Sequence, residues 1–320
     1  MTIIRTINSE VDIRKGLNRN FKLNRVFEQN SFYLSSGAGA YYNINSELRL
    51  HHKKKNDWKT EYNFLKKNFL KKNQNIAFIS LGCGNGGREK EILAKAQEEG
   101  YNLKYFGVDC SMSMIALAVD NLRNKSYKKD FICADFTSVD FRIELENIVG
   151  EFDKKIFVFF GNTLANVPQN YIADTLRNLL KKDDILWLDV ATRDDLSEST
   201  AGDLFENYLN YIKNEDYIKF FTSPLEKIGV NLNSGELIME MKKENSLNAL
   251  QFQYGFHLNK KIEVKVDNEY ITLIPGDNIE LINTRIYDVT SLISFFEARH
   301  FKLIDNIKTG GFTEICFKKE

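Results

Sequence analysis

The stretch Phe78–Arg88, FISLGCGNGGR, decides the fold. An apolar run ends in four glycines within six residues, and a helix-like sequence, EKEILAKA, follows. Glycine permits positive φ and lets a ligand approach the backbone closely. A strand that ends in such a turn before a helix is typical of the ligand-binding edge of an open parallel sheet. The glycines alone leave two alternatives open. One is a plain tight turn; the other is a dinucleotide site, because Gly82, Gly84 and Gly87 also fit G-x-G-x-x-G.

Strand-like and helix-like segments alternate from Ile76 to Val190. The strand-like segments are apolar on both faces, which is typical of a parallel sheet covered by helices on both sides. They are Ile76–Leu81, Lys104–Asp109, Asp130–Ala134, Lys155–Phe160 and Asp184–Val190. The sequence therefore predicts an α/β fold with a Rossmann-like, doubly wound sheet.

The alternation of strand-like and helix-like segments ends after Val190. One helix is expected over 196–219, and period-2 segments between 236 and 287 then predict antiparallel strands. A helix over 290–299 and two strands joined by Gly310-Gly311 complete the chain. We therefore expect a cofactor domain made of 58–195 and 289–320, an inserted α+β substrate-binding unit at 196–288, and an N-terminal segment, 1–57, that contributes to a substrate lid. The terminal antiparallel hairpin favours a class I methyltransferase sheet.

Polar and aromatic residues follow the predicted strands at their carboxyl ends. Asp109 ends the second strand, where a carboxylate can accept both ribose hydroxyls. After the third strand, Asp135 can accept the adenine amino proton while the ring of Phe136 covers the base. The fourth strand leads into Gly161–Asn166, GNTLAN, where the reactive part of a ligand would lie. A nicotinamide enzyme has no evident use for the last two segments, so together they favour S-adenosylmethionine (SAM) as the cofactor.

Composition narrows the partners. Lys+Arg and Asp+Glu both number 44, so the basic footprint of a nucleic-acid binder is missing. No apolar run approaches the length of a membrane span, and the start of the chain does not resemble a secretory signal. The four cysteines lack the CxxC spacing of a structural zinc site. We expect a cytoplasmic protein with a small-molecule partner, no nucleic acid, no membrane and no metal; the oligomeric state stays open.

On these motifs the chain resembles the SAM-dependent histidine-specific methyltransferase family. Its best-known members trimethylate the α-amino group of histidine on the way to ergothioneine, and related fungal enzymes N-methylate a prenylated tryptophan. The family's glycine motif, roughly E-L-G-S-G-T-S-E-K, corresponds to Ser80–Arg88. Its later motif, G-S-T-I-G-N, corresponds to Gly161–Asn166. The resemblance covers most of the chain from about Ser31 onward.

The resemblance implies roles for individual residues. Those that would hold SAM are Gly82, Gly84, Gly86, Arg88 (in place of the family's Lys), Asp109, Asp135, Phe136, Gly161 and Asn162. Asn166 would orient the substrate's amino group, and Tyr33 matches an N-terminal tyrosine that closes over the amine and the cofactor. These two are the candidate catalytic residues.

The substrate positions depart from the family pattern. The family reads the imidazole of histidine with a Glu and a Ser two residues apart, and the corresponding positions here are Ile282 and Thr284. A tyrosine pair that grips the substrate carboxylate falls near His52. An imidazole N–H left unpaired in the pocket would cost about 1–3 kcal/mol. We therefore expect N-methylation of a small amine or amino acid other than histidine, although a shift in register that brings in Glu280 would restore histidine.

Two other classes of function remain open from the sequence. The departures at the substrate positions also allow a non-catalytic protein that binds SAM or S-adenosylhomocysteine (SAH). A methyltransferase that acts on a protein or an RNA is the second alternative, which the neutral charge balance and the inserted unit disfavour.

Overall fold

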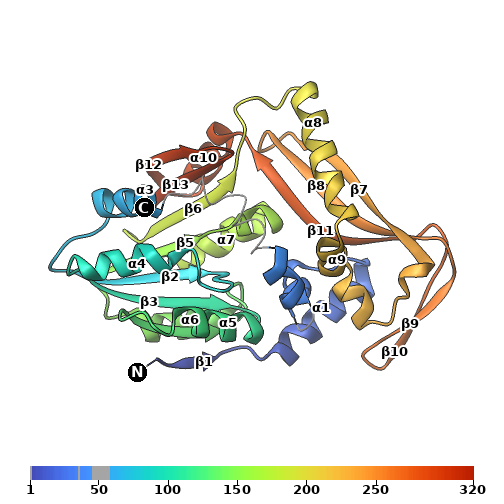
Figure 1. Ribbon diagram of the computed structural model, residues 1–320, viewed down its shortest axis with the longest axis horizontal. Helices are drawn as coiled ribbons and strands as arrows, with labels where there is room; N and C mark the ends of the chain where they lie inside the picture. The colour runs from blue at the N-terminus through green and yellow to red at the C-terminus, as the bar shows by residue number, and fades with distance from the viewer. Residues whose placement is uncertain (1, 35–36, 45–57) are drawn as a thin grey trace.

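The computed structural model describes residues 2–34, 37–44 and 58–320. Eight strands form the larger sheet, in the order β1-β4-β3-β2-β5-β6-β13-β12 (Figure 1). They are β1 (Ile4–Thr6), β2 (Asn75–Leu81), β3 (Asn102–Asp109), β4 (Lys128–Cys133), β5 (Lys154–Phe159), β6 (Ile185–Ala191), β12 (Phe301–Thr309) and β13 (Phe312–Lys319). Strands β1 to β6 run parallel, and β13 lies antiparallel to both β6 and β12. The predicted doubly wound sheet with a terminal antiparallel hairpin is confirmed.

Strand order reverses beside β2. From β2 the chain moves outward through β3 and β4, and then returns to place β5 on the other side of β2. In an open α/β sheet, ligands bind in the crevice at such a reversal, beyond the carboxyl ends of the strands. The loops after β2 and β5 are the two glycine-containing motifs of the sequence, so the topology brings them to one edge.

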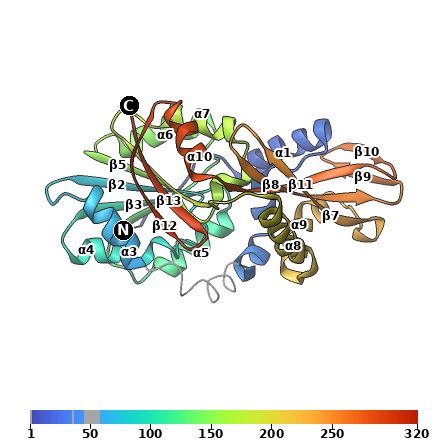
Figure 2. The ribbon, with the colours of Figure 1, turned by 90° about the horizontal axis from the view of Figure 1, so that it is seen from above.

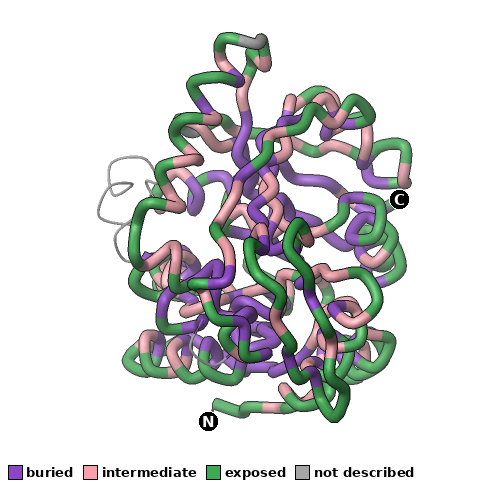
Figure 3. Tube along the Cα trace, turned by 90° about the vertical axis from the view of Figure 1, so that its right-hand side faces the viewer, coloured by how far each residue is buried: buried purple, intermediate pink, exposed green. Residues whose placement is uncertain are grey.

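Helices cover both faces of this sheet. Three helices pack on one face: α3 (Trp58–Asn68), α4 (Glu89–Glu98) and α5 (Met112–Leu122). The other face is covered by α6 (Val139–Val149), α7 (Gln169–Leu179) and α10 (Val289–Glu297). Successive side chains of a strand point to opposite faces. In β2, Ile76 and Phe78 pack in the core under α3, α4 and α5, while Ala77 and Ile79 pack in the core under α6, α7 and α10. This is why its sequence is apolar throughout. Figure 3 shows the buried residues running through the interior of the molecule.

A smaller, three-stranded sheet occupies the other half of the molecule (Figure 2). Its order is β11 (Asn278–Tyr287), β8 (Ala249–Leu258), β7 (Gly235–Glu244), and a separate hairpin is formed by β9 (Ile262–Val266) and β10 (Glu269–Leu273). Two helices, α8 (Glu198–Leu209) and α9 (Glu215–Lys227), pack on it, with short 3-10 turns at η3 (Asn210–Lys213) and η4 (Leu232–Ser234). Aromatic stacking joins helices to sheet: ring centroids lie 4.2 Å apart in Tyr208–Phe252 and 4.4 Å apart in Phe221–Tyr254.

The sequence prediction of one helix over 196–219 is wrong. The structure has two helices, because Asn214 caps the start of α9 by accepting hydrogen bonds from the backbone N–H groups of Asp216 (3.0 Å) and Tyr217 (3.3 Å). The sequence also gave no expectation of α6, although Ser138 caps it and Phe141, Leu145 and Val149 form its buried stripe. In both cases the sequence signal is a capping side chain, Asn214 or Ser138, followed by apolar residues at helical spacing.

The N-terminal segment contacts both halves. Strand β1 extends the larger sheet by pairing with β4, and α1 (Glu10–Asn24) and η1 (Gln29–Tyr33) follow. Val26 then forms an isolated parallel bridge with Glu280 of β11. Neither β1 nor α1 was expected from the sequence. The division into a cofactor domain and an inserted unit, and the lid role of 1–57, stay predictions.

Candidate active site

The turn after β2 folds against the end of β3. The N–H groups of Gly82 and Cys83 both donate to the carbonyl oxygen of Val108, each at 2.9 Å. Gly84 has φ of 53°, and its N–H donates to Asp109 Oδ2 at 2.9 Å. A Cβ built on Gly84 would have no neighbour within 4 Å, so the backbone there faces open space. The turn therefore presents bare backbone beside a carboxylate.

Asp109 is buried, with 7% of its surface exposed. Burial raises the pKa of its carboxyl, and hydrogen bonds from the N–H groups of Ser111 and Gly84 offset part of the rise. The resulting pKa is about 6. Each carboxylate oxygen accepts one of these bonds, and a carboxylate can accept about four hydrogen bonds in all. Two hydroxyl donors, such as those of a ribose, would supply the hydrogen bonds that this buried carboxylate cannot receive from water.

Asp135 and Phe136 lie at the next strand end. Oδ1 of Asp135 accepts from the N–H (2.9 Å) and the hydroxyl (2.7 Å) of Thr137, and the ring of Phe136 meets that of Phe159 edge-on with centroids 5.3 Å apart. Asp135 therefore serves as a turn former through one oxygen. In the same loop, Asn8 accepts from the N–H of Asp135 at 3.2 Å, which fastens the N-terminal segment to this edge.

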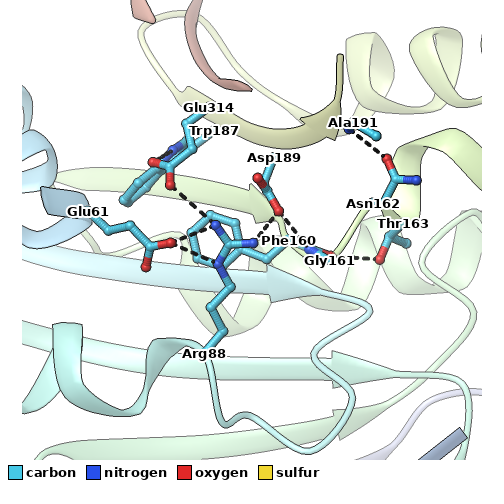
Figure 4. A network of polar contacts seen from close by, with 10 residues as sticks. All are labelled: Glu61, Arg88, Phe160, Gly161, Asn162, Thr163, Trp187, Asp189, Ala191 and Glu314. Carbon is cyan, nitrogen blue, oxygen red and sulfur yellow. Dashed lines mark hydrogen bonds and ion pairs between the residues drawn. The ribbon is translucent and has the colours of Figure 1, made fainter. Parts of the chain in front are cut away.

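Asn162 ties the loop after β5 to two other strands. It lies in the left-handed region at φ 63°, directly after Gly161 at φ 71°. Its Oδ1 accepts from the N–H of Ala191 at 3.0 Å, and its Nδ2 donates to Thr284 Oγ1 at 3.3 Å (Figure 4 shows the contact with Ala191). Ala191 ends β6 and Thr284 belongs to β11, so Asn162 joins the larger sheet to the smaller one at the ligand edge.

Asn166 ends the short turn η2 (Thr163–Asn166). The turn is held from outside, since Arg285 donates to the carbonyls of Ala165 (3.0 Å) and Val167 (3.2 Å), and Gln169 donates to that of Val167 at 2.8 Å. Within the described part of the chain, the half-buried side chain of Asn166 has no hydrogen bond. The backbone is thus fixed while the amide remains available to a ligand.

Three carboxylates surround Arg88 (Figure 4). Its guanidinium contacts Asp189, and its Nη2 lies 2.7 Å from Glu61 and 3.2 Å from Glu314. The ring of Phe160 covers it at 4.4 Å. All three carboxylates are buried. The predicted contact between Arg88 and the cofactor stays a prediction; what the structure shows is a guanidinium already bonded to protein acids.

Three carboxylates around one guanidinium carry excess negative charge. Burial raises the pKa of Glu314 above its ordinary value, and the charge of Glu61 raises it further, whereas that of Arg88 lowers it. Glu314 Oε1 contacts Arg88, and its Oε2 accepts from the indole N–H of Trp187 at 3.2 Å. Glu314 therefore retains a proton more readily than an ordinary glutamate.

Tyr33 lies close to the ligand edge. Its ring packs on Tyr41 and Phe220, with centroids 4.9 Å and 5.4 Å away. Burial raises the pKa of Tyr33 well above its ordinary value, and the charge of Asp109 raises it further. Leu34, the next residue, packs on Cys110, which follows Asp109, so Tyr33 lies in an aromatic cluster near the end of β3.

The face of β11 that carries Ile282 and Thr284 can be read from its pairing. Thr284 pairs with Phe252 and shares its face, and Ile282, two residues earlier, lies on that face too and is buried. The register shifts between Glu280 and Asn283, so Glu280 falls on the opposite face, where its Oε1 accepts from Asn283 at 2.6 Å. The position that faces inward is thus a hydrocarbon.

The family model for SAM-dependent histidine-specific methyltransferases matches residues 12–311. The chain belongs to this family. No curated protein matches the chain in sequence. The match confirms the resemblance drawn from the two glycine motifs, and with it the class I methyltransferase fold and SAM as the cofactor.

Solved structures of similar fold include other methyltransferases. One is an S-adenosylmethionine-dependent methyltransferase from Clostridium acetobutylicum, at 14% identity, with 87% of this chain and 98% of that chain covered and a TM-score of 0.46. The complex of DhpI with SAH has 10% identity, covers 95% and 98% of the two chains, and has a TM-score of 0.45. The CcbJ methyltransferase from Streptomyces caelestis has 12% identity, 82% and 95% coverage, and a TM-score of 0.41.

The residues of this methyltransferase fit SAM at the ligand edge. Gly84 and Gly161 both have positive φ with no neighbour within 4 Å of a built Cβ, which leaves room for a ligand against the backbone. Gly86 has a packing reason as well, because a Cβ there would meet Leu122 at 2.9 Å. Asp109 offers a buried carboxylate beside this space.

Several residues of the site were not found from the sequence. They are Glu61, Asp189, Arg285 and Glu314. Arg88 and Glu314 are 226 residues apart, so no local spacing could have paired them. His52, a predicted substrate residue, lies outside the described residues. In the described ranges no group of three or more His, Cys, Asp or Glu is placed to hold a metal ion, and no helix there is long and apolar enough to cross a membrane.

Proposed function

We propose that this methyltransferase N-methylates a small amine or amino acid whose side chain is less polar than that of histidine. The observation that supports this most strongly is Ile282 on the inward face of β11, together with the placement of Glu280 on the other face. A shift in register was the route by which Glu280 could have read an imidazole, and the bulge makes that route unfavourable. Histidine would therefore lose a hydrogen bond worth about 1–3 kcal/mol.

The neighbourhood of the proposed acceptor is aromatic. Tyr33, Tyr41 and Phe220 pack against one another within 5.5 Å between ring centroids. Aromatic faces attract cations, so these rings favour the ammonium of a methylated amine. They also favour an apolar side chain on the acceptor.

When bound, SAM supplies an electrophilic methyl group on a sulfonium. The protein's part is to position the amine and to exclude water. We infer that the Asn166 amide oxygen accepts an N–H of the acceptor and so directs its lone pair, while Gly84 and Asp109 hold the cofactor. Ile282 and the rings at Tyr33 keep water away from the nitrogen.

An acceptor panel tests the proposal. SAH formation from SAM is measured with histidine, with leucine and phenylalanine, and with phenethylamine. We expect kcat/KM for the best apolar acceptor to exceed that for histidine by roughly tenfold or more. Ile282→Glu should raise relative turnover of histidine, whereas the matched variant Ile282→Met should keep the wild-type order. A preference of the wild type for histidine would overturn the assignment of the acceptor.

The same panel separates the rival functions. SAH binding without turnover of any acceptor would indicate a binding protein and contradict catalysis. Asn166→Ala should reduce kcat roughly a hundredfold while SAH affinity is retained. If the variant loses stability but keeps its turnover, Asn166 is a turn residue and not a catalytic one.

A further inference from the structure

A cavity of about 90 Å³ lies between α1, η1, α9 and β9. Half of its lining residues are apolar, among them Phe27 and Val266. Three cationic side chains line it, Arg14, Lys227 and Lys265, against one carboxylate, Asp267. Asp267 is already engaged by Lys22 at 3.2 Å and by Asn18 at 2.7 Å. The cavity thus combines hydrocarbon walls with an excess of positive charge.

Lys227 is half-buried, as is Arg14, whereas Lys265 is exposed. The Nζ of Lys227 donates to the carbonyl oxygens of Ser31 (3.3 Å) and Leu34, which leaves one of three protons for another acceptor. Burial and the charge of Arg14 together lower its pKa to about 8. A buried cation with a second cation as its neighbour is stabilised by an anion between them.

Ser31 adds an unpaired donor to the same wall. Only 5% of the residue is exposed, and its hydroxyl is buried without a hydrogen-bond partner, although the residue lines the cavity. An unpaired buried hydroxyl costs free energy that a ligand acceptor would recover. The hydroxyl and the ammonium therefore offer two kinds of donor to one small anion, and the guanidinium of Arg14 adds positive charge on the same wall.

We propose that this cavity binds a small organic carboxylate with a short hydrocarbon chain, at a site separate from the cofactor and the methyl acceptor. The carboxylate lies between Lys227, Arg14 and Ser31, and the chain lies on the apolar wall. The cavity is nonetheless near the active site. Leu17 and Leu34, which line it, also pack on Cys110, the residue after Asp109. The inference does not depend on which amine is methylated.

Calorimetric titration of the full chain with butyrate at pH 7 tests the proposal. Ser31→Ala removes the unpaired hydroxyl without adding bulk, so it should fold and should raise the Kd for butyrate roughly fivefold. Lys227→Gln should raise it about tenfold or more. The matched control is Lys265→Gln at the exposed rim, where we expect less than about a twofold change. The proposal involves no transfer of a butyryl group to SAM or to the acceptor. Saturation with SAH should leave butyrate binding in place.

Charge and pH sharpen the test. Butylamine, which has a similar chain and the opposite charge, should not bind, and inorganic phosphate should bind more weakly than butyrate. Between pH 7 and pH 9 the Kd for butyrate should rise, because Lys227 loses its proton near pH 8 whereas Arg14 keeps its charge. Glu10 and Glu226 act on Lys227 in the opposite sense, and the Lys227→Gln variant should lack the pH dependence. Equal binding of butylamine, tighter binding of phosphate, competition by SAH, or an unchanged Kd in both Ser31→Ala and Lys227→Gln would each overturn the proposal.

Discussion

The two halves of this molecule are built by different means. In the larger sheet, glycine turns and carboxylates stand directly after the strands, as with Gly84 after β2 and Asp109 at the end of β3. In the smaller half, stacked rings from separate elements join helices to the sheet, as Tyr208 does on buried Phe252. The first arrangement is written locally in the sequence and the second is assembled by packing. Short motifs therefore reveal the edge of the larger sheet, whereas the packing of the smaller half cannot be read from neighbouring residues.

The largest effect is expected at Arg88. Arg88→Met leaves three buried carboxylates without their cation, so the free energy of unfolding should fall by about 3–5 kcal/mol at pH 7. Denaturant unfolding measures this. The loss should be smaller at pH 5, where protonation relieves the repulsion. A loss below about 1 kcal/mol together with weakened SAH binding would instead show that Arg88 serves the cofactor directly, as the family motif implies.

Asp109→Ala should act on affinity more than on folding. Removing the acceptor for two hydroxyls should weaken SAH binding roughly a hundredfold, about 2.7 kcal/mol. Asp135→Ala is the matched control at the next strand end, and we expect a smaller loss there because one oxygen of Asp135 is occupied by Thr137. Calorimetric titration with SAH distinguishes the two. Equal losses would contradict the assignment of the ribose to Asp109.

Glu314→Gln should change the pH dependence of stability. Since the folded-state pKa of Glu314 is raised, its contribution is full below the ordinary carboxyl pKa and is lost as pH rises toward the raised value. The wild type should therefore weaken from pH 5 to pH 8 more steeply than the variant. Thermal melts over this range measure the difference. An identical pH profile in both proteins would mean that Glu314 is ionised throughout.

The smallest effect is expected where the halves meet. Thr284→Val keeps the shape of the side chain but removes the acceptor for Asn162, so stability should fall by about 1 kcal/mol. Because Asn162 also binds Ala191, the loop should remain in place and SAH affinity should be almost unchanged. Thr284→Ser, which keeps the hydroxyl, is the control. A large loss of SAH affinity in Thr284→Val would show that β11 shapes the cofactor site as well as the acceptor site.

The sequence predicted the sheet and its ligand edge because both depend on short-range patterns. Apolar runs ending in Gly82 or Asp109 needed no knowledge of distant contacts. It could not predict the acid group around Arg88, whose members come from α3, β6 and β13. It also could not predict β1, whose three residues carry no periodicity and are held by a partner 127 residues away. The sequence also could not predict which face of β11 carries Ile282, because a bulge in the pairing with β8 determines it.

The pairing of β1 with β4 has a consequence for how the chain is made. Ile4 meets Phe131, and buried Asp130 accepts from the N–H of Ile3 at 3.0 Å and pairs with Arg5 at 3.3 Å. During translation this first strand has no partner until well over a hundred further residues have left the ribosome. Strands with open edges invite pairing with the wrong chain, and Arg5 beside it discourages such contacts until β4 arrives. One edge strand of the finished sheet is therefore synthesised well before the strand with which it pairs.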